Sequence, residues 1–200
     1  IFVYMKIYIT RHSLTAWNEE KRLQGWKDSP LTKQGKEDAL KLGEYMKTIH
    51  IDQVYSSPLL RAKSTARLIF KNENIIEDSR LKEMNFGDWE GKTTQWIYEH
   101  HPEELAKFWE TPTYYTPPDA EPITDFHQRI EKSHIEIQQR MQQHQFKKAL
   151  VITHGGVIKM FKLMTQKQPL DDILKMSAEL GQLVSFKTNE QNQIIWEQQQ

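Results

Sequence analysis

Cysteine is missing from the 200-residue sequence, and so is any formal net charge. The lack of cysteine excludes disulfides, thiolate-bound zinc and a cysteine nucleophile within the chain. The net charge is zero because 27 Lys and Arg residues balance 27 Asp and Glu residues. A chain without an excess charge gives no electrostatic signal for nucleic acid or acidic membranes, so we expect neither as a partner.

Long hydrophobic runs are missing as well. No stretch reaches the roughly 18–20 unbroken apolar residues of a membrane-spanning helix. The apolar segment 1–10 is interrupted by Lys6, and no small-residue cleavage site follows it, so we expect no signal peptide. Without an export signal, the expected location is the cytoplasm. The sequence leaves open whether Met5 is the natural start, with Ile1–Tyr4 as an upstream remnant.

Apolar material is present in sufficient amount for a buried core. Hydrophobic residues make up 38% of the chain, and they include six Trp, seven Tyr and eight Phe. This composition excludes a disordered chain, and the length suits one domain. No linker rich in Pro or Gly divides the sequence, so we predict a single domain over residues 1–200. The region of about 91–122 is rich in Trp, Tyr, Pro and His, and we expect it to form a small cap of helical pieces and loops.

Strand and helix patterns alternate along the sequence. Runs of β-branched and apolar residues predict strands at 3–10, 53–56 and 149–153, the last suited to burial on both faces. Amphipathic spacing predicts helices at 32–49, 123–145 and 157–164, and another with Ser57 as N-cap and Pro58 as its first residue. We expect a hairpin of 183–187 and 193–196 to close the chain. The alternation predicts an α/β fold in three layers, with a mostly parallel central sheet and helices on both faces.

Three segments place cationic or imidazole groups where a strand ends or a helix begins. They are Arg11-His12, Arg61 and His154. In a parallel sheet all three would meet at the carboxyl edge, where guanidiniums and helix N-termini suit a dianionic phosphate. Taken singly, each has a plainer interpretation: a solvated strand end, a surface helix residue or a tight turn. Together and in this order they are more specific than any one alone.

The same residues belong to longer motifs between residues 7 and about 160. These read RHSLTAWN at 11–18, LQGW at 23–26, DSPLT at 28–32 with Gly35, SSPLLRA at 56–62 with Thr65 and Ala66, LKEMNFGDWEG at 81–91, and VITHGG at 151–156. In these motifs, and in their order, the chain resembles the histidine phosphatase superfamily, in its phosphoglycerate mutase-like group. The resemblance implies the fold of that group.

The resemblance also implies roles for individual residues. His12 matches the nucleophile that becomes a phosphohistidine, and Glu83 matches the general acid. Arg11, Arg61 and His154 match the groups that stabilise the phosphoryl charge. The expected substrate contacts come from Arg11, Asn18, Gln24, Gly25, Arg61, His154 and Gly155. No metal and no cofactor is expected, because a neutral imidazole is a good nucleophile near pH 7.

Several points stay open at this stage. Asp88 and Glu90 are alternative proton donors to Glu83. The family usually has glycine after the nucleophile, whereas this chain has Ser13, which either adds a hydroxyl to the phosphate site or narrows it. The expected partner is a small phosphomonoester substrate, and the sequence does not indicate an oligomeric state.

The type of reaction is predicted from the segment Glu83–Gly87 and from the cap. Mutases of the family carry Glu-Arg-His-Tyr-Gly where this chain has Glu-Met-Asn-Phe-Gly, and the stretch 98–119 offers one Lys against five acidic residues. Both features resemble the phosphatase branch, so we predict a phosphatase, a metal-independent hydrolase of small phosphorylated metabolites. A cofactor-dependent phosphoglycerate mutase and a catalytically inactive phosphate-binding relic are the alternatives. The aromatic residues of the cap either face an apolar substrate or simply pack the cap; they are Trp96, Trp109, Tyr114 and Tyr115.

Overall fold

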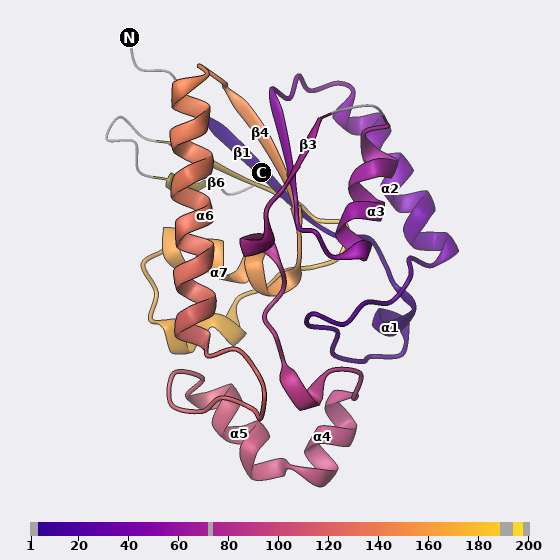
Figure 1. Cartoon of the computed structure of the whole chain (residues 1–200), viewed down its shortest axis with the longest axis vertical. Helices are drawn as coiled ribbons and strands as arrows, with labels where there is room; N and C mark the ends of the chain where they lie inside the picture. The colour runs from indigo at the N-terminus through magenta and orange to yellow at the C-terminus, as the bar shows by residue number, and fades with distance from the viewer. Residues whose placement is uncertain (1–3, 72–73, 189–193, 198–200) are drawn as a thin grey trace.

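A computed structural model describes residues 4–71, 74–188 and 194–197 (Figure 1). In this part of the chain, six strands form one sheet in the order β3-β2-β4-β1-β5-β6. The strands are β1 (Lys6–Arg11), β2 (Gln53–Ser56), β3 (Ile75–Glu77), β4 (Lys148–Thr153), β5 (Leu183–Thr188) and β6 (Ile194–Glu197). Strands β1 to β4 pair in parallel, whereas β5 pairs antiparallel with β1, and β6 antiparallel with β5. The predicted α/β fold with a mostly parallel central sheet is confirmed.

Helices cover both faces of the sheet, and the side chains of β4 show why. Leu150 and Ile152 pack into an apolar cluster with α2 (Lys33–Met46) and α3 (Leu60–Ile69). Ala149 and Val151 belong to a second cluster with α6 (Ile123–Gln143) and α7 (Gly155–Thr165). All four side chains are fully buried, because strand side chains alternate between two faces and both faces are covered. Figure 1 shows α2 and α3 together on one side of the sheet and α6 on the other.

The parallel pairing of β1 with β4 brings two distant segments together. Arg11 lies opposite Thr153, and the backbone N–H of His12 donates to the carbonyl of Thr153 at 2.8 Å. Strand β2 ends beside them, where the N–H of Ser57 donates to the carbonyl of Ile152 at 3.0 Å. The residues that follow β1, β2 and β4 therefore leave the sheet at one edge, where ligands bind in folds of this kind.

One helix begins later than the sequence predicts. Helix α3 starts at Leu60, whereas we expected Ser57 as N-cap and Pro58 as the first residue. The reason is tertiary, because the carboxylate of Asp28, from a distant loop, accepts from the N–H groups of Leu60 at 2.7 Å and Arg61 at 3.3 Å. This carboxylate satisfies the first N–H groups of the helix, which a local side chain usually does. The Ser57 hydroxyl accepts from the N–H of Leu59, just before the helix, at 3.3 Å, and it also lies 2.7 Å from Nε2 of His154.

The other predicted elements match within a few residues. Helix α2 is capped by Thr32, whose Oγ1 accepts from the N–H of Gly35 at 3.0 Å, and it ends at Met46 rather than at 49. Strands β5 and β6 form the closing hairpin, although the expected strand residue Gln193 lies outside the described residues. The first residue of the first expected strand, at 3, lies outside them too. The sequence pattern does not predict β3, a short strand at the edge of the sheet.

The segment expected to form the cap contains α4 (Thr94–His100) and α5 (Pro102–Glu110), which lie together at the bottom of the view in Figure 1. Short helical turns lie between the larger elements: α1 (Ala16–Glu19), η1 (Ser79–Leu81), η2 (Gly87–Trp89) and η3 (Leu170–Lys175). The single domain over 1–200 and the cap limits at about 91–122 stay predictions. Within the described residues, every helix is too short or too polar to cross a membrane.

Candidate active site

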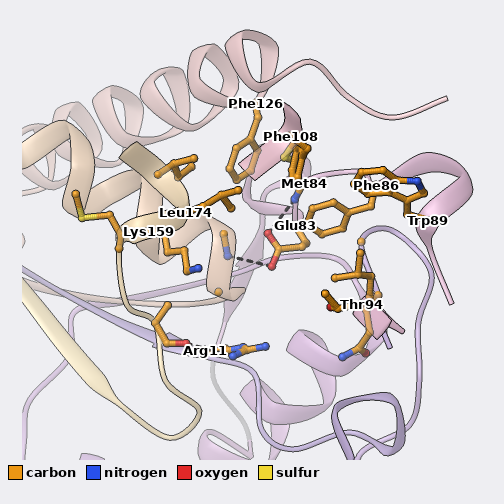
Figure 2. Close-up of a pocket in the computed structure, with 18 of the residues that line it drawn as sticks. Arg11, Glu83, Met84, Phe86, Trp89, Thr94, Phe108, Phe126, Lys159 and Leu174 are labelled. Carbon is orange, nitrogen blue, oxygen red and sulfur yellow. Dashed lines mark hydrogen bonds between the residues drawn. The ribbon is translucent and has the colours of Figure 1, made fainter. Parts of the chain in front are cut away.

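A cavity of about 460 Å³ opens at the edge of the sheet where β1 and β4 end (Figure 2). Most of the site residues predicted from the sequence line it: Arg11, His12, Asn18, Gln24, Gly25, Arg61, Glu83 and Gly155. His154 does not line the cavity, but its ring packs next to that of His12, with the centroids 5.3 Å apart. The volume of the cavity suits a small organic molecule.

The imidazole of His12 is buried, with only 2% of the residue exposed. Its Nδ1 lies 2.9 Å from the carbonyl oxygen of Ser13. A carbonyl can only accept, so Nδ1 carries the proton and the lone pair of Nε2 is free. Burial lowers the pKa of His12 well below its ordinary value of 6.5, and the charges of Arg61 and Arg11 lower it further. The ring is therefore neutral at pH 7, the form that a nucleophile needs.

Ser13 occupies the position where the family usually has glycine. Its backbone N–H donates to Oγ1 of Thr65, on α3, at 3.0 Å. Its φ is negative, so the backbone here does not require glycine. The side chain is buried and does not line the cavity. Neither the added hydroxyl nor the narrowed site that we considered from the sequence is visible at the cavity wall.

Arg61 lines the cavity, and its side chain is held in place by several hydrogen bonds. Its guanidinium donates to the carbonyl of Gly25 at 2.6 Å, to the carbonyl of Lys27 at 2.9 Å and to the carboxylate of Asp28 at 2.8 Å. The side chain is almost completely buried, with 1% of the residue exposed. These contacts leave the guanidinium one orientation, which is the preorganisation that charge stabilisation in catalysis requires.

The loop that holds Arg61 depends on a glycine and a buried carboxylate. Gly25 has a φ of +54°, and a Cβ there would lie 2.0 Å from Oε1 of Glu90. That carboxylate accepts from the N–H of Trp26 at 2.8 Å and from the N–H of Lys27 at 3.0 Å. Glu90 therefore organises the loop and does not line the cavity.

Several side chains near His12 carry buried nitrogens that lack a hydrogen-bond partner. Among the described residues, six buried side-chain polar atoms lack a hydrogen-bond partner, and three of them are Arg11 Nε, Arg61 Nε and His154 Nδ1. Arg11 otherwise donates to the carbonyl of Ala178 at 3.2 Å, and His154 Nε2 lies 2.7 Å from the hydroxyl of Ser57. Buried polar groups are normally paired, so this cluster fits a hydrogen-bond acceptor, and the guanidiniums favour an anion.

The positively charged groups of this cluster repel one another, and burial adds to the cost of their charge. Burial lowers the pKa of Arg11, with Arg61 adding to the effect and Glu83 opposing it. Burial also lowers the pKa of His154 well below 6.5, and the charge of Arg61 contributes. Two guanidiniums in a small buried volume repel each other, and a bound dianion would relieve both the repulsion and the loss of hydration.

Glu83 is the carboxylate of the cavity. Only 9% of the residue is exposed, and its Oε2 accepts from the N–H of Gly156 at 3.0 Å while Oε1 accepts from the N–H of Met84 at 2.9 Å. Of the two alternative donors, Asp88 is exposed and does not line the cavity, and Glu90 is occupied by backbone N–H groups. The geometry favours Glu83, although its role as the acid stays a prediction.

Asn18 and Gln24 line the cavity, and the amide oxygen of each side chain accepts a hydrogen bond from Thr15. Asn18 Oδ1 accepts from the N–H of Thr15 at 3.1 Å and lies 2.9 Å from the hydroxyl of Thr15. The same hydroxyl lies 3.1 Å from Gln24 Oε1. These contacts leave the two NH₂ groups as donors for an anion in the cavity.

Four residues at the site were not assigned a role in the site from the sequence. Asp28 orients Arg61, Ser57 contacts His154, Thr65 holds the backbone of Ser13, and Lys159 lines the cavity. Ser57 directly follows a strand that ends at the edge of the sheet where the site lies, and this position could have indicated a role in the site. Lys159 lies one helical turn beyond Gly155 and Gly156 and shares their face of α7, which could have indicated such a role as well.

Beyond the cations, the cavity continues into an apolar chamber. We define this chamber by six side chains: Met84, Phe86, Trp89, Phe108, Phe126 and Leu174 (Figure 2). The ring of Phe108 meets those of Trp89 and Phe86 edge-on, with centroids 5.5 Å and 6.3 Å apart. Edge-on packing of this kind holds the rings in place and leaves apolar surface for a ligand.

The four cap aromatics considered from the sequence mostly do not form this chamber. Trp109 lines the cavity, but Trp96 stacks on His100, and Tyr114 is 87% exposed. Tyr115 packs near Trp89, with centroids 6.4 Å apart, and does not line the cavity. For these three residues packing or exposure is observed, and the apolar chamber is made by other aromatics.

Comparison with known proteins adds independent findings. A family model described as the histidine phosphatase superfamily (branch 1) matches residues 7–198. Phosphoserine phosphatase 1 of Hydrogenobacter thermophilus is 30% identical over 152 residues, which cover 75% of this chain and 71% of that protein. A 2,3-bisphosphoglycerate-dependent phosphoglycerate mutase of Chlamydia muridarum is 24% identical over 218 residues, which cover 92% of this chain and 94% of that protein. The similar sequences thus include proteins named as a phosphatase and as a mutase.

Solved structures agree with this result. YhfR of Bacillus stearothermophilus superposes with a TM-score of 0.86 at 32% sequence identity, and the match covers 96% of this chain and 95% of that one. A phosphoglycerate mutase of Bacillus anthracis superposes with a TM-score of 0.84 at 28% identity, covering 98% of this chain and 92% of that one. The fold is shared along nearly the whole chain.

Proposed function

The chain belongs to the histidine phosphatase superfamily (branch 1), and we propose that it is a phosphatase that hydrolyses small phosphomonoesters through a phosphohistidine intermediate. One observation carries the proposal. Three unpaired buried nitrogens belong to Arg11, Arg61 and His154, and these three side chains lie close to the neutral imidazole of His12, whose Nε2 lone pair is free. A phosphoryl group in the cavity would receive hydrogen bonds and a nucleophile together.

In the first step, Nε2 of His12 attacks phosphorus, and the bond from phosphorus to the ester oxygen breaks. Negative charge spreads over the three equatorial oxygens, where Arg11, Arg61 and His154 stabilise it. Glu83 gives its proton to the departing alkoxide, so the alcohol leaves neutral. The ring of His12 becomes positively charged, and the bond from Nδ1–H to the Ser13 carbonyl stabilises that charge.

In the second step, a water molecule attacks phosphorus on the opposite side from His12. The Glu83 carboxylate, now ionised, takes a proton from this water, which restores its acid form. The bond from phosphorus to Nε2 breaks, and inorganic phosphate leaves. The same residue therefore serves as acid and then as base, and His12 returns to its neutral form.

The lining of the cavity favours a hydrolase over a mutase. A mutase that works through 2,3-bisphosphoglycerate must hold a second phosphate dianion, which needs a second set of cations. Apart from Arg11 and Arg61, the cations among the described lining residues are Arg22 and Lys159. Arg22 is already paired with Glu20 at 2.5 Å, so Lys159 is left alone beside an apolar chamber.

We expect the purified protein to release phosphate from p-nitrophenyl phosphate and from a panel of small phosphomonoesters, because the whole constellation around His12 is present. Incubated with 3-phosphoglycerate and 2,3-bisphosphoglycerate, it should not interconvert the 3- and 2-phosphate isomers, as followed by NMR. Isomer exchange faster than hydrolysis would favour the mutase. No turnover at any pH between 4 and 9 would favour the phosphate-binding relic.

Metal independence is tested by removing divalent ions. The proposed nucleophile and charge-stabilising groups are all side chains of this chain, so we expect dialysis against EDTA to change kcat/KM for p-nitrophenyl phosphate less than about twofold. A control dialysed without EDTA allows for losses on handling. A fall that Mg²⁺, Mn²⁺ or Zn²⁺ reverses would contradict the proposed chemistry.

A further inference from the structure

Lys159 is a cation of the cavity that the proposed reaction does not use. It lies on α7, three residues after Gly156, whose N–H holds the general acid Glu83. Figure 2 shows its side chain reaching into the pocket on the same side as Arg11, with the Glu83 carboxylate facing them. Lys159 therefore lies at the junction of the phosphate site and the apolar chamber.

The ammonium of Lys159 has no hydrogen bond or ion pair with the part of the chain that the structure describes. The Glu83 carboxylate is near enough to raise the pKa of Lys159, but its oxygens accept from two backbone N–H groups. Burial is the largest influence and lowers that pKa, and Arg11 lowers it too. By contrast Lys162, one turn further along α7, donates to the carbonyl of Ser177 at 2.7 Å.

An unpaired ammonium in a half-buried position is unfavourable, because lost hydration is not replaced. A ligand that supplies the missing hydrogen bonds would offset this cost, and charged groups in unfavourable positions cluster at binding sites for that reason. The position of Lys159 tells where that ligand group would lie. Glu83 must reach the ester oxygen to protonate it, so a group that contacts Lys159 beside Glu83 is only a few bonds from that oxygen.

We propose that Lys159 binds a carboxylate of the substrate, carried on the carbon next to the ester carbon or on the ester carbon itself. The rest of the leaving group is apolar and occupies the chamber of Met84, Phe86, Trp89, Phe108, Phe126 and Leu174. The substrate class is thus a phosphorylated hydroxy acid with an aromatic or aliphatic side chain. This inference rests on the proposed phosphatase function and names the leaving group that it releases.

A carboxylate fits this position better than a second phosphate. One ammonium balances one negative charge, whereas a dianion would need further cations, and the chamber walls offer none. The rim adds a negative charge instead, since Glu179 lines the cavity there and raises the pKa of Lys162. Beyond Lys159, the aromatic and aliphatic walls gain most from burying apolar surface.

The test compares two esters of nearly the same shape. One is the phosphate ester of phenyllactate, with a carboxylate on the ester carbon, and the other is 1-phenylpropan-2-yl phosphate, with a methyl group in its place. The measured quantity is the ratio of their kcat/KM values, because effects common to both esters cancel. Lys159→Met should lower this ratio by about 10- to 100-fold, the worth of one hydrogen bond to a charged group, mainly through a higher KM for the carboxylate ester.

Two further variants make the result specific. Lys159→Arg keeps the charge and should restore most of the ratio, and Lys41→Met removes an exposed lysine outside the cavity and should not change it. Circular dichroism checks that each variant is folded. An unchanged ratio in Lys159→Met, or an equal loss on both esters, would overturn the role of Lys159.

Failure of this inference and failure of the proposed function are distinguishable. If the wild type hydrolyses p-nitrophenyl phosphate but its ester ratio does not depend on Lys159, the phosphatase stands and the carboxylate site is rejected. If the wild type turns over no ester, the phosphatase is rejected, and calorimetric titration with the same two esters still tests the site. Tighter binding of the carboxylate ester that Lys159→Met removes would support the site, and equal binding of the two would reject it.

Discussion

Replacing His12 by alanine is expected to lower kcat/KM for p-nitrophenyl phosphate by at least about 10⁴-fold, since loss of a nucleophile removes the covalent route altogether. The structure gives the reason, because Nε2 of His12 has a free lone pair among buried arginines. Steady-state release of p-nitrophenolate measures the effect directly.

The matching control is His144→Ala, which removes an exposed histidine that does not line the cavity and should leave the rate unchanged. The covalent step has its own readout. Wild type mixed with ³²P-labelled substrate and quenched in alkali should carry label on a histidine, and His12→Ala should carry none. Activity of the alanine variant within tenfold of wild type would remove His12 from its assigned role.

The second large effect is expected for Glu83→Gln, and its size should depend on the leaving group. An alkyl phosphate releases a basic alkoxide, so loss of the acid should lower kcat/KM by about 10²- to 10⁴-fold. p-Nitrophenolate scarcely needs a proton, and its ester should lose much less. Glutamine keeps the size of the side chain but has one acceptor oxygen for the N–H groups of Gly156 and Met84, so part of the loss will be common to both esters.

The comparison with Asp88→Asn separates the candidate acids. Asp88 is exposed and does not line the cavity, so its amide should behave as wild type on both esters. Rates for p-nitrophenyl phosphate and for a simple alkyl phosphate, measured in parallel for the three proteins, decide the matter. If Glu83→Gln lowers kcat/KM by the same factor for both esters, Glu83 has a structural role and is not the acid. If Asp88→Asn lowers kcat/KM for the alkyl phosphate alone, Asp88 is the acid instead.

Much of the fold follows from patterns that act over a few residues. The apolar run at 149–153 predicts a strand buried on both faces, and Leu150 and Val151 indeed pack into different clusters. The end of each strand follows from the same pattern, so the meeting of Arg11, His12 and Arg61 at one edge is predictable once the strands are parallel. The resemblance supplied the expected roles of these residues.

Other features depend on contacts between distant parts of the chain. Helix α3 begins at Leu60 because Asp28, far away in sequence, satisfies its first N–H groups. The cap sequence is aromatic throughout, but it does not say which rings face the cavity. Phe108 does so, while Trp96 stacks on His100. Composition cannot separate the two, because both bury apolar surface.

The amino-acid sequence by itself thus determined the α/β layering, the residues gathered at the sheet edge and the absence of any thiol chemistry. Only the tertiary structure decided how these residues are held: the proton on Nδ1 of His12, the three unpaired nitrogens, and the solitary ammonium of Lys159 beside Glu83. The physical reason is range. Strand and helix periods arise from neighbours along the chain, whereas burial, hydrogen-bond partners and pKa shifts arise from residues that meet only after folding.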